Sequence, residues 1–316
     1  MMIKRQLFYF LVFATILSST ACRRSTGYEP DHSDDQPYKD PLSGYSIKRF
    51  PYLDTEWFRV FVSDNEGKGP HWSGGYNGIS ALIPHDSGIN IFNPYFAGLN
   101  YETIELSGTE GELFEPRRNQ MSITEWTSEK VVLEQPETPA SHVSARITFR
   151  VEDPWYVYQT IELTFHRSSP ASGVPTEFSS LFASYMHLPV DNHLYLRMDD
   201  SGENPLSGWV GVTKENHNSE QYIVRQLPGN EELDPVGHLE AMNHGESSSE
   251  MMGMKGPLPF YYGLLYDGLV FLQMFKQPEH VELAYSPTGG FHGDRGDGSG
   301  QAWSPAWDYI LHLDDV

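Results

Sequence analysis

The sequence predicts an all-β protein built as a large antiparallel sandwich. Aromatic residues make up 13% of the 316 residues. Runs of alternating apolar and polar residues are separated by Gly, Pro, Asn and Asp, which is typical of strands joined by turns. No stretch predicts a long helix, and no fixed-period repeat indicates a propeller or a β-helix. Many strands without βαβ alternation favour packed antiparallel sheets.

The clearest structural unit is a hairpin in the segment FYYGLLYDGLVFLQMF. Asp267 and Gly268 separate two apolar runs, as in a two-residue type I′ turn, because both turn positions need a positive φ. This turn pairs Tyr266 with Leu269. Both faces of the hairpin are apolar, so we expect it to lie centrally in its sheet.

Other strands follow from the same period-two pattern. A second hairpin is expected around Asp153-Pro154, between HVSARITFRV and WYVYQTIELTF. Further strands are expected at residues 57–63, 79–83, 178–188, 193–198, 208–213, 221–227, 281–285 and 307–313.

The N-terminus, residues 1–21, has the features of a secretory signal peptide. Lys4 and Arg5 give a positive start, and LFYFLVFATIL is too short to span a bilayer, which takes about 20 residues. The ending S-T-A-C resembles a bacterial lipobox, in which cleavage before Cys22 leaves that residue to be lipidated. Cys22 is the only cysteine, and an unpaired thiol has little structural use in an oxidising compartment. The alternative is an ordinary signal peptide with an incidental cysteine.

Residues 22–47 are expected to form a lipidated cysteine and a disordered tether, because they are polar, rich in Pro, Asp and Ser, and without hydrophobic periodicity. Residues 48–316 then form the β domain. We therefore expect a lipid-anchored protein of the bacterial cell envelope, at the outer membrane or the periplasmic face. A secreted protein is the alternative.

Net charge restricts the partners. The formal charge is −22, and loss of Lys4 and Arg5 with the signal peptide makes the mature chain more negative still. Nucleic acid and anionic membrane surfaces are therefore poor partners, so contact with a membrane is expected only through the lipid anchor. Arg117-Arg118 is a basic doublet within the β domain, and Arg118 is a candidate for binding an acidic sugar.

Familiar catalytic and cofactor motifs are absent from the sequence. There is no GxSxG, HExxH, P-loop, or GxGxxG followed by a helix, so we expect no cofactor. A structural calcium ion is disfavoured: when Asp294 is counted as position 1 of a calcium loop, Gly296 and Gly298 occupy positions 3 and 5, where the loop needs carboxylates. No metal site is expected.

The glycine-rich stretch GGFHGDRGDGSGQAWSPAWDY, residues 289–309, favours a mobile flap. Its Arg295-Gly296-Asp297 tripeptide is disfavoured as an adhesion motif, because so short a string recurs by chance in glycine-rich loops. We expect His292 and Trp307 to border a binding site. Deletion of residues 293–299 is expected to weaken ligand binding without unfolding the domain.

The composition favours carbohydrate as the ligand. Tryptophan and tyrosine stack on the C–H face of a sugar, and polar side chains bind its hydroxyls. The chain has 7 Trp and 18 Tyr, several beside such polar groups. Trp303, Trp307 and Asp308 are the strongest candidates next to the flap, and Tyr262 of the hairpin is added to the expected substrate-binding residues. The alternative is that these aromatic residues only fill a sandwich core and its turns.

Three segments together resemble a known group. NGISALIPHDSGINIFNPYFAGLNYETI, LFEPRRNQMSITEW and ELAYSPTGGFHGD…SPAWDYILHL are similar to segments of uncharacterised exported bacterial proteins of planctomycete type. That group is associated with the galactose-mutarotase-like β-supersandwich. The resemblance implies two large, curved antiparallel sheets with few or no long helices and a saccharide cleft on the concave face.

Members of that superfamily include sugar epimerases, in which a glutamate acts as base and a histidine as acid. No glutamate of this sequence is assigned to that role. His187 and His217 are the candidate acid/base residues, since histidine suits proton transfer near neutral pH. The alternative is that both are hydrogen-bonded structural histidines.

Three functions stay open. The main hypothesis is a saccharide-binding lipoprotein that also acts on its ligand, as a mutarotase does. The second is a polysaccharide lyase or glycoside hydrolase, in which Arg118 neutralises a uronate or two carboxylates flank the scissile bond. The third is a non-catalytic surface adhesin or assembly component.

Overall fold

Antiparallel β-sheets make up the fold, which confirms the predicted all-β class. The computed structural model describes residues 5–16, 38–41, 44, 46–47, 51–65, 77–88, 90–92, 94, 97–106, 115–152, 156–166, 177–184, 194–197, 209–214, 222–226, 239–241, 252–254, 260–264, 269–275, 281–286 and 304–312. Within these ranges the single helix, α1 (Glu115–Arg118), is one turn long.

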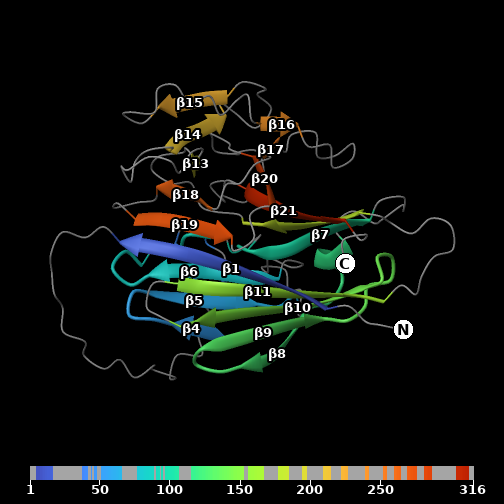
Figure 1. Cartoon of the computed structure of the whole chain (residues 1–316). Coiled ribbons are helices and arrows are strands. Elements are labelled where there is room, and N and C mark those ends of the chain that lie inside the picture. Colours follow the sequence, from blue (N-terminus) through green and yellow to red (C-terminus); the bar gives the residue numbers. More distant parts are fainter. Residues whose placement is uncertain are drawn as a thin grey trace.

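The largest sheet has ten strands in the order β15-β14-β13-β18-β19-β1-β11-β10-β9-β8 (Figure 1). Its strands are β1 (Arg5–Ile16), β8 (Ser122–Trp126), β9 (Lys130–Gln135), β10 (Val143–Val151), β11 (Tyr156–Phe165), β13 (Leu194–Arg197), β14 (Trp209–Lys214), β15 (Tyr222–Gln226), β18 (Phe260–Leu264) and β19 (Leu269–Phe275).

A six-stranded sheet has the order β16-β17-β20-β21-β12-β7, and two smaller sheets have the orders β4-β5-β6 and β2-β3. The strands of these three sheets are β16 (Leu239–Ala241), β17 (Met252–Met254), β20 (Val281–Ser286), β21 (Ser304–His312), β12 (Glu177–Ala183), β7 (Asn100–Leu106), β4 (Tyr52–Asp54), β5 (Phe58–Ser63), β6 (Gly78–Pro84), β2 (Tyr38–Lys39) and β3 (Ser46–Ile47).

The best described core lies between the sheet β4-β5-β6 and the strands β9 and β10, which contact β4. Alternation explains which residues enter it: in β10 the apolar Ala145, Ile147 and Phe149 are buried, while the polar residues between them are half-buried on the other face. Leu53 of β4 and Val60 of β5 are fully buried. The opposite face of β4-β5-β6 is consequently turned outward.

The strands expected from periodicity are all present, with ends that differ by a few residues. The strand expected at 178–188 ends at Ala183 as β12. The hairpin around Asp153-Pro154 is confirmed, with β10 paired to β11 and Val151 opposite Val157.

The predicted register of the Asp267-Gly268 hairpin is wrong by one residue. β18 and β19 do pair. The predicted pairing of Tyr266 with Leu269 would put Leu264 opposite Phe271, but Leu264 lies opposite Val270. Each strand also pairs on its other side, β18 with β13 and β19 with β1. These outer pairings constrain the register independently of the turn, because a one-residue slip would exchange the two faces of a strand. The turn residues lie outside the described residues.

β1 coincides with the segment predicted to be a signal peptide. In the full-length chain it lies between β11 and β19 and is antiparallel to both. Figure 1 shows it crossing the middle of the ten-stranded sheet. Removal of residues 1–21 on export would therefore leave β11 and β19 without this shared neighbour.

β2 and β3 lie within the segment expected to be a tether. Tyr38 of β2 packs beside Phe61 of β5, with ring centroids 5.7 Å apart, and Asp40 is fully buried. Two short paired strands therefore lie within residues 22–47, and Tyr38 of this segment packs on Phe61 of the outward face of β4-β5-β6.

Candidate functional site

Most residues that the sequence predicted for the site lie outside the described residues: His187, His217, His292, Trp303 and Cys22. Their proposed roles remain predictions. The other predicted residues fall on described elements in different parts of the fold.

Tyr262 and Trp307 belong to different sheets. Tyr262 lies in β18, opposite Tyr195 and Leu272 in the ten-stranded sheet. Trp307 and Asp308 lie in β21 of the six-stranded sheet. The strand order therefore does not place Tyr262 beside Trp307 as a paired neighbour.

The basic doublet has two different environments. Arg117 donates a 2.6 Å hydrogen bond to Glu102, a carboxylate that is 1% exposed, whereas Arg118 is exposed at the end of α1. Nearby, the buried Glu115 accepts hydrogen bonds from the backbone N–H groups of Ala140 and Ser141. Arg117 thus neutralises a buried charge, and the role of Arg118 at a binding site stays a prediction.

The described residues bring together a different group, on the outward face of β4-β5-β6. We name it the β4–β6 surface and define it as Tyr52, Asp54, Arg59, His85 and Trp126. Tyr52 and Asp54 share one face of β4, because they are two residues apart in a strand. The register then places Asp54 opposite Arg59. His85 follows the last residue of β6.

Thr55 shapes the turn that presents these side chains. Its hydroxyl accepts hydrogen bonds from the backbone N–H groups of Trp57 (3.2 Å) and Phe58 (3.1 Å), which closes a tight turn between β4 and β5. The N–H of His85 donates to the carbonyl of Trp57 at 2.8 Å. This hydrogen bond links the turn before β5 to the residue that follows β6.

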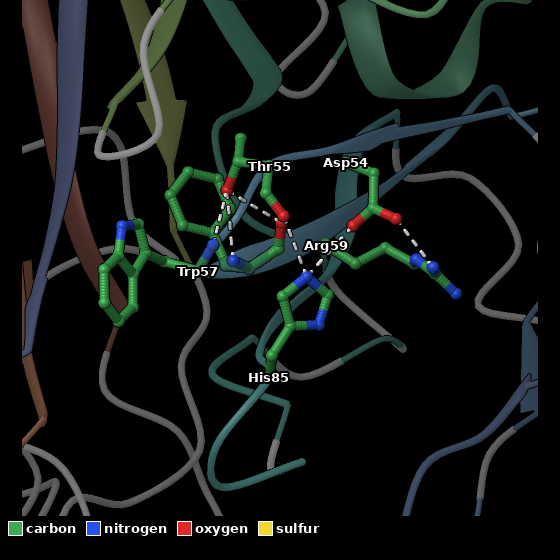
Figure 2. Close-up of polar contacts among 6 residues, drawn as sticks. Asp54, Thr55, Trp57, Arg59 and His85 are labelled. Atoms are coloured by element: carbon green, nitrogen blue, oxygen red, sulfur yellow. Dashed lines mark hydrogen bonds and ion pairs between the residues drawn. The ribbon is translucent and has the colours of Figure 1, made fainter. Parts of the chain in front are cut away.

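Asp54 is shared by two basic side chains, as Figure 2 shows. Its Oδ2 lies 2.7 Å from Nη2 of Arg59, and its Oδ1 lies 3.1 Å from Nε2 of His85. Burial alone raises the pKa of Asp54, but the contacts with His85 and Arg59 outweigh burial and hold that pKa below its ordinary 3.8. The carboxylate is therefore charged at neutral pH.

His85 has one nitrogen directed at two acceptors (Figure 2). Besides Asp54, its Nε2 lies 3.0 Å from the carbonyl oxygen of Thr55. Neither oxygen can donate, so Nε2 carries a hydrogen in both protonation states, and the titrating proton belongs to Nδ1. The contact with Asp54 raises the pKa of His85 above 6.5, against the opposing effect of burial.

Aromatic rings continue the surface on the other side of Arg59. The Arg59 guanidinium carbon lies 5.0 Å from the centre of the Tyr52 ring, a cation–π distance. The Tyr52 and Trp126 rings are 6.0 Å apart, and the indole N–H of Trp126 donates to the carbonyl of Tyr52 at 3.1 Å. Trp126 is 45% exposed, the one large hydrophobic side chain so exposed among the described residues.

The arrangement combines an exposed aromatic platform with a carboxylate, a guanidinium and an imidazole. Such a set can stack on an apolar ring and hydrogen-bond its polar substituents. His85 also has the form of an acid/base group, because Nε2 is held by the Thr55 carbonyl beside the Asp54 carboxylate, which leaves Nδ1 as the exchanging atom. In the part of the chain that the structure describes, no cluster of three or more His, Cys, Asp or Glu could hold a metal ion.

A second tyrosine–arginine pair offers a comparison. Arg150 lies 5.3 Å from the ring of Tyr158 and pairs with Glu152 at 2.9 Å, on the outer face of β10 and β11. No histidine joins this pair through its carboxylate in the contacts described. It reproduces the Tyr52–Arg59–Asp54 contacts without the imidazole.

Sequence reasoning missed the β4–β6 surface. Trp126 and His85 stood in segments used only for the resemblance, and Asp54 lay just before an expected strand. The signal was present in YLDTEWFRV, where a tyrosine and a carboxylate alternate with an apolar residue. Nothing local indicated that His85 would reach that carboxylate, because a third strand separates them.

Comparisons with known proteins found no match for this chain. No family model, no curated protein and no solved structure matches the chain. Across the described ranges, helices long and apolar enough to cross a bilayer do not occur.

Proposed function

We propose that the chain is an exported, lipid-anchored protein whose β domain binds a saccharide at the β4–β6 surface. One observation carries the proposal: Trp126 is exposed and packs on Tyr52, beside the charged Arg59 and Asp54. Exposed aromatic side chains next to fixed polar groups suit a ligand that has one apolar face and a rim of hydroxyls.

Charge favours a neutral saccharide over an acidic one. Asp54 is ionised and forms ion pairs with both Arg59 and His85. The exposed Glu56 and Asp86 lie in the adjoining turns. A uronate would have to compete with these carboxylates for the two basic groups. Arg118, the residue proposed for uronate binding, lies on α1 and outside this surface.

The experiment is a glycan array with the purified, detergent-solubilised protein, followed by calorimetric titration of the best oligosaccharide. Trp126→Ala should weaken binding about tenfold, which corresponds to about 1.4 kcal/mol. Tyr158→Ala is the matched control, because it removes an aromatic ring beside an arginine elsewhere on the protein. Equal losses for the two variants, or an array without any bound glycan, would reject the assignment.

Saccharide processing is the second candidate, and the Asp54–His85 pair favours it. An imidazole held close to a carboxylate can exchange a proton with a sugar hydroxyl. For this second candidate function, we also propose that the fold is a galactose-mutarotase-like supersandwich. Anomerisation of a bound sugar, followed in wild type and in His85→Gln, tests it; equal rates would remove His85 from any catalytic role.

A further inference from the structure

We propose that protonation of His85 controls the packing of Tyr52 and Trp126, which makes the β4–β6 surface a pH-switched binding site. The role in binding rests on the proposed function, whereas the switch itself rests on the contacts alone.

The contacts form one continuous series. His85 meets Oδ1 of Asp54, and Oδ2 of the same carboxylate meets Arg59. Arg59 in turn lies over the ring of Tyr52, which packs against Trp126. Each neighbouring pair is in direct contact, so a change at the imidazole has a defined route to the indole.

The charged groups near His85 lie on two strands and in two turns. Asp54 lies on β4, Arg59 on β5, and the exposed Glu56 and Asp86 lie in the turns before β5 and after β6. Asp54 favours the imidazolium and Arg59 opposes it, and the net effect raises the pKa of His85. The proton is consequently held to a higher pH than in an ordinary histidine.

Loss of that proton changes what Asp54 does to Arg59. With His85 charged, the carboxylate is shared by two cations, one on each oxygen. With His85 neutral, the Nε2 hydrogen remains but the second positive charge is gone, so Arg59 alone balances Asp54. The stronger pull of Asp54 draws the guanidinium from the Tyr52 ring, and the packing of Tyr52 against Trp126 changes with it.

The test uses the ¹⁵N-labelled full-length protein. The indole N–H of Trp126 is the reporter, because it donates to the Tyr52 carbonyl, and Trp126→Phe assigns its resonance. We expect this resonance to titrate with the same midpoint as His85, above pH 6.5. An indole resonance that stays constant while His85 titrates would overturn the proposal.

Three variants separate the route from a general pH effect. His85→Gln keeps a side-chain donor but no titrating proton, and it should abolish the indole titration. Arg59→Gln should abolish it while His85 still titrates. His166→Gln is the control, since His166 follows the end of β11 and contacts Ser144 of β10. This substitution should leave the titration of the Trp126 indole unchanged. Persistence of the indole titration in His85→Gln or Arg59→Gln would contradict the route.

A binding measurement separates this inference from the proposed function. The tightest oligosaccharide from the glycan array should bind about two- to fivefold more weakly above the pKa of His85 than below it, the range that a surface cation–π contact supports. Equal affinity on both sides, with a titrating indole, would reject regulation of binding. If no glycan binds while the indole titrates with His85, the switch is supported and the saccharide function fails.

Discussion

His85 and Asp54 lie on opposite sides of β5, and Nε2 of the first is 3.1 Å from Oδ1 of the second. This contact joins the turn after β6 to the end of β4, and its energy depends on pH. It is the source of two of the following predictions.

His85→Gln should destabilise the protein only where His85 is protonated in the folded state. The folded pKa is raised above 6.5, so the contribution is fully present below pH 6.5 and disappears as the pH rises through the folded pKa. The side chain is 38% exposed, and screening by solvent keeps the effect below about 1 kcal/mol. Urea unfolding across this pH range measures it. A difference from wild type that grows with pH would contradict the assignment.

Asp54→Asn should show the opposite pH dependence at the acidic end. The folded pKa of Asp54 is below 3.8, so its contribution is present above pH 3.8 and is lost as the pH falls through the folded pKa. We expect a loss of about 1 kcal/mol near neutral pH, because two basic partners lose their carboxylate. Glu137→Gln, in the exposed pair with His142, is the control and should change stability by less than about 0.5 kcal/mol.

Arg117→Met and Arg118→Met should differ strongly in the free energy of unfolding. Loss of Arg117 removes the ion-pair partner of Glu102, which is 1% exposed, and a cost of about 3 kcal/mol is expected. Arg118 is exposed, so its replacement should change stability by less than about 0.5 kcal/mol. Equal effects of the two substitutions would show that Glu102 does not depend on Arg117.

Gly78→Ala should destabilise the start of β6. Gly78 has φ +118, and an added Cβ would lie 2.7 Å from the carbonyl oxygen of Gly98. Gly88 has φ +63 but open space around the position of a Cβ. We expect a loss of more than about 2 kcal/mol for Gly78→Ala and about 1 kcal/mol for Gly88→Ala, from urea midpoints. A milder effect at Gly78 than at Gly88 would be inconsistent with this backbone approach.

The exported protein should begin at a lipidated Cys22. Mass spectrometry of the membrane fraction should find a modified N-terminal cysteine and no peptide from residues 5–16, the segment of β1. Cys22→Ser should abolish the modification. Recovery of residues 5–16 from the mature protein would instead show that β1 stays between β11 and β19.

The sequence did not predict which aromatic residues the fold brings together. Trp307 was expected at the site because it stands beside a polar residue, and Tyr262 was expected there as well, but strand pairing puts the two in different sheets. Trp126 was not chosen, although it is exposed and packs against Tyr52, over which Arg59 lies. Exposure depends on which face another sheet covers, and that is not encoded within a few residues.

The amino-acid sequence by itself determined the all-β class and the position of most strands, because apolar alternation and turn residues act over a few neighbours. It could not determine the register of β18 with β19, since partners on both outer sides constrain that pairing. Nor could it bring His85 to Asp54. Only the antiparallel order β4-β5-β6 does so, because it places the end of β6 near the end of β4 and leaves Nε2 of His85 3.1 Å from Oδ1 of Asp54.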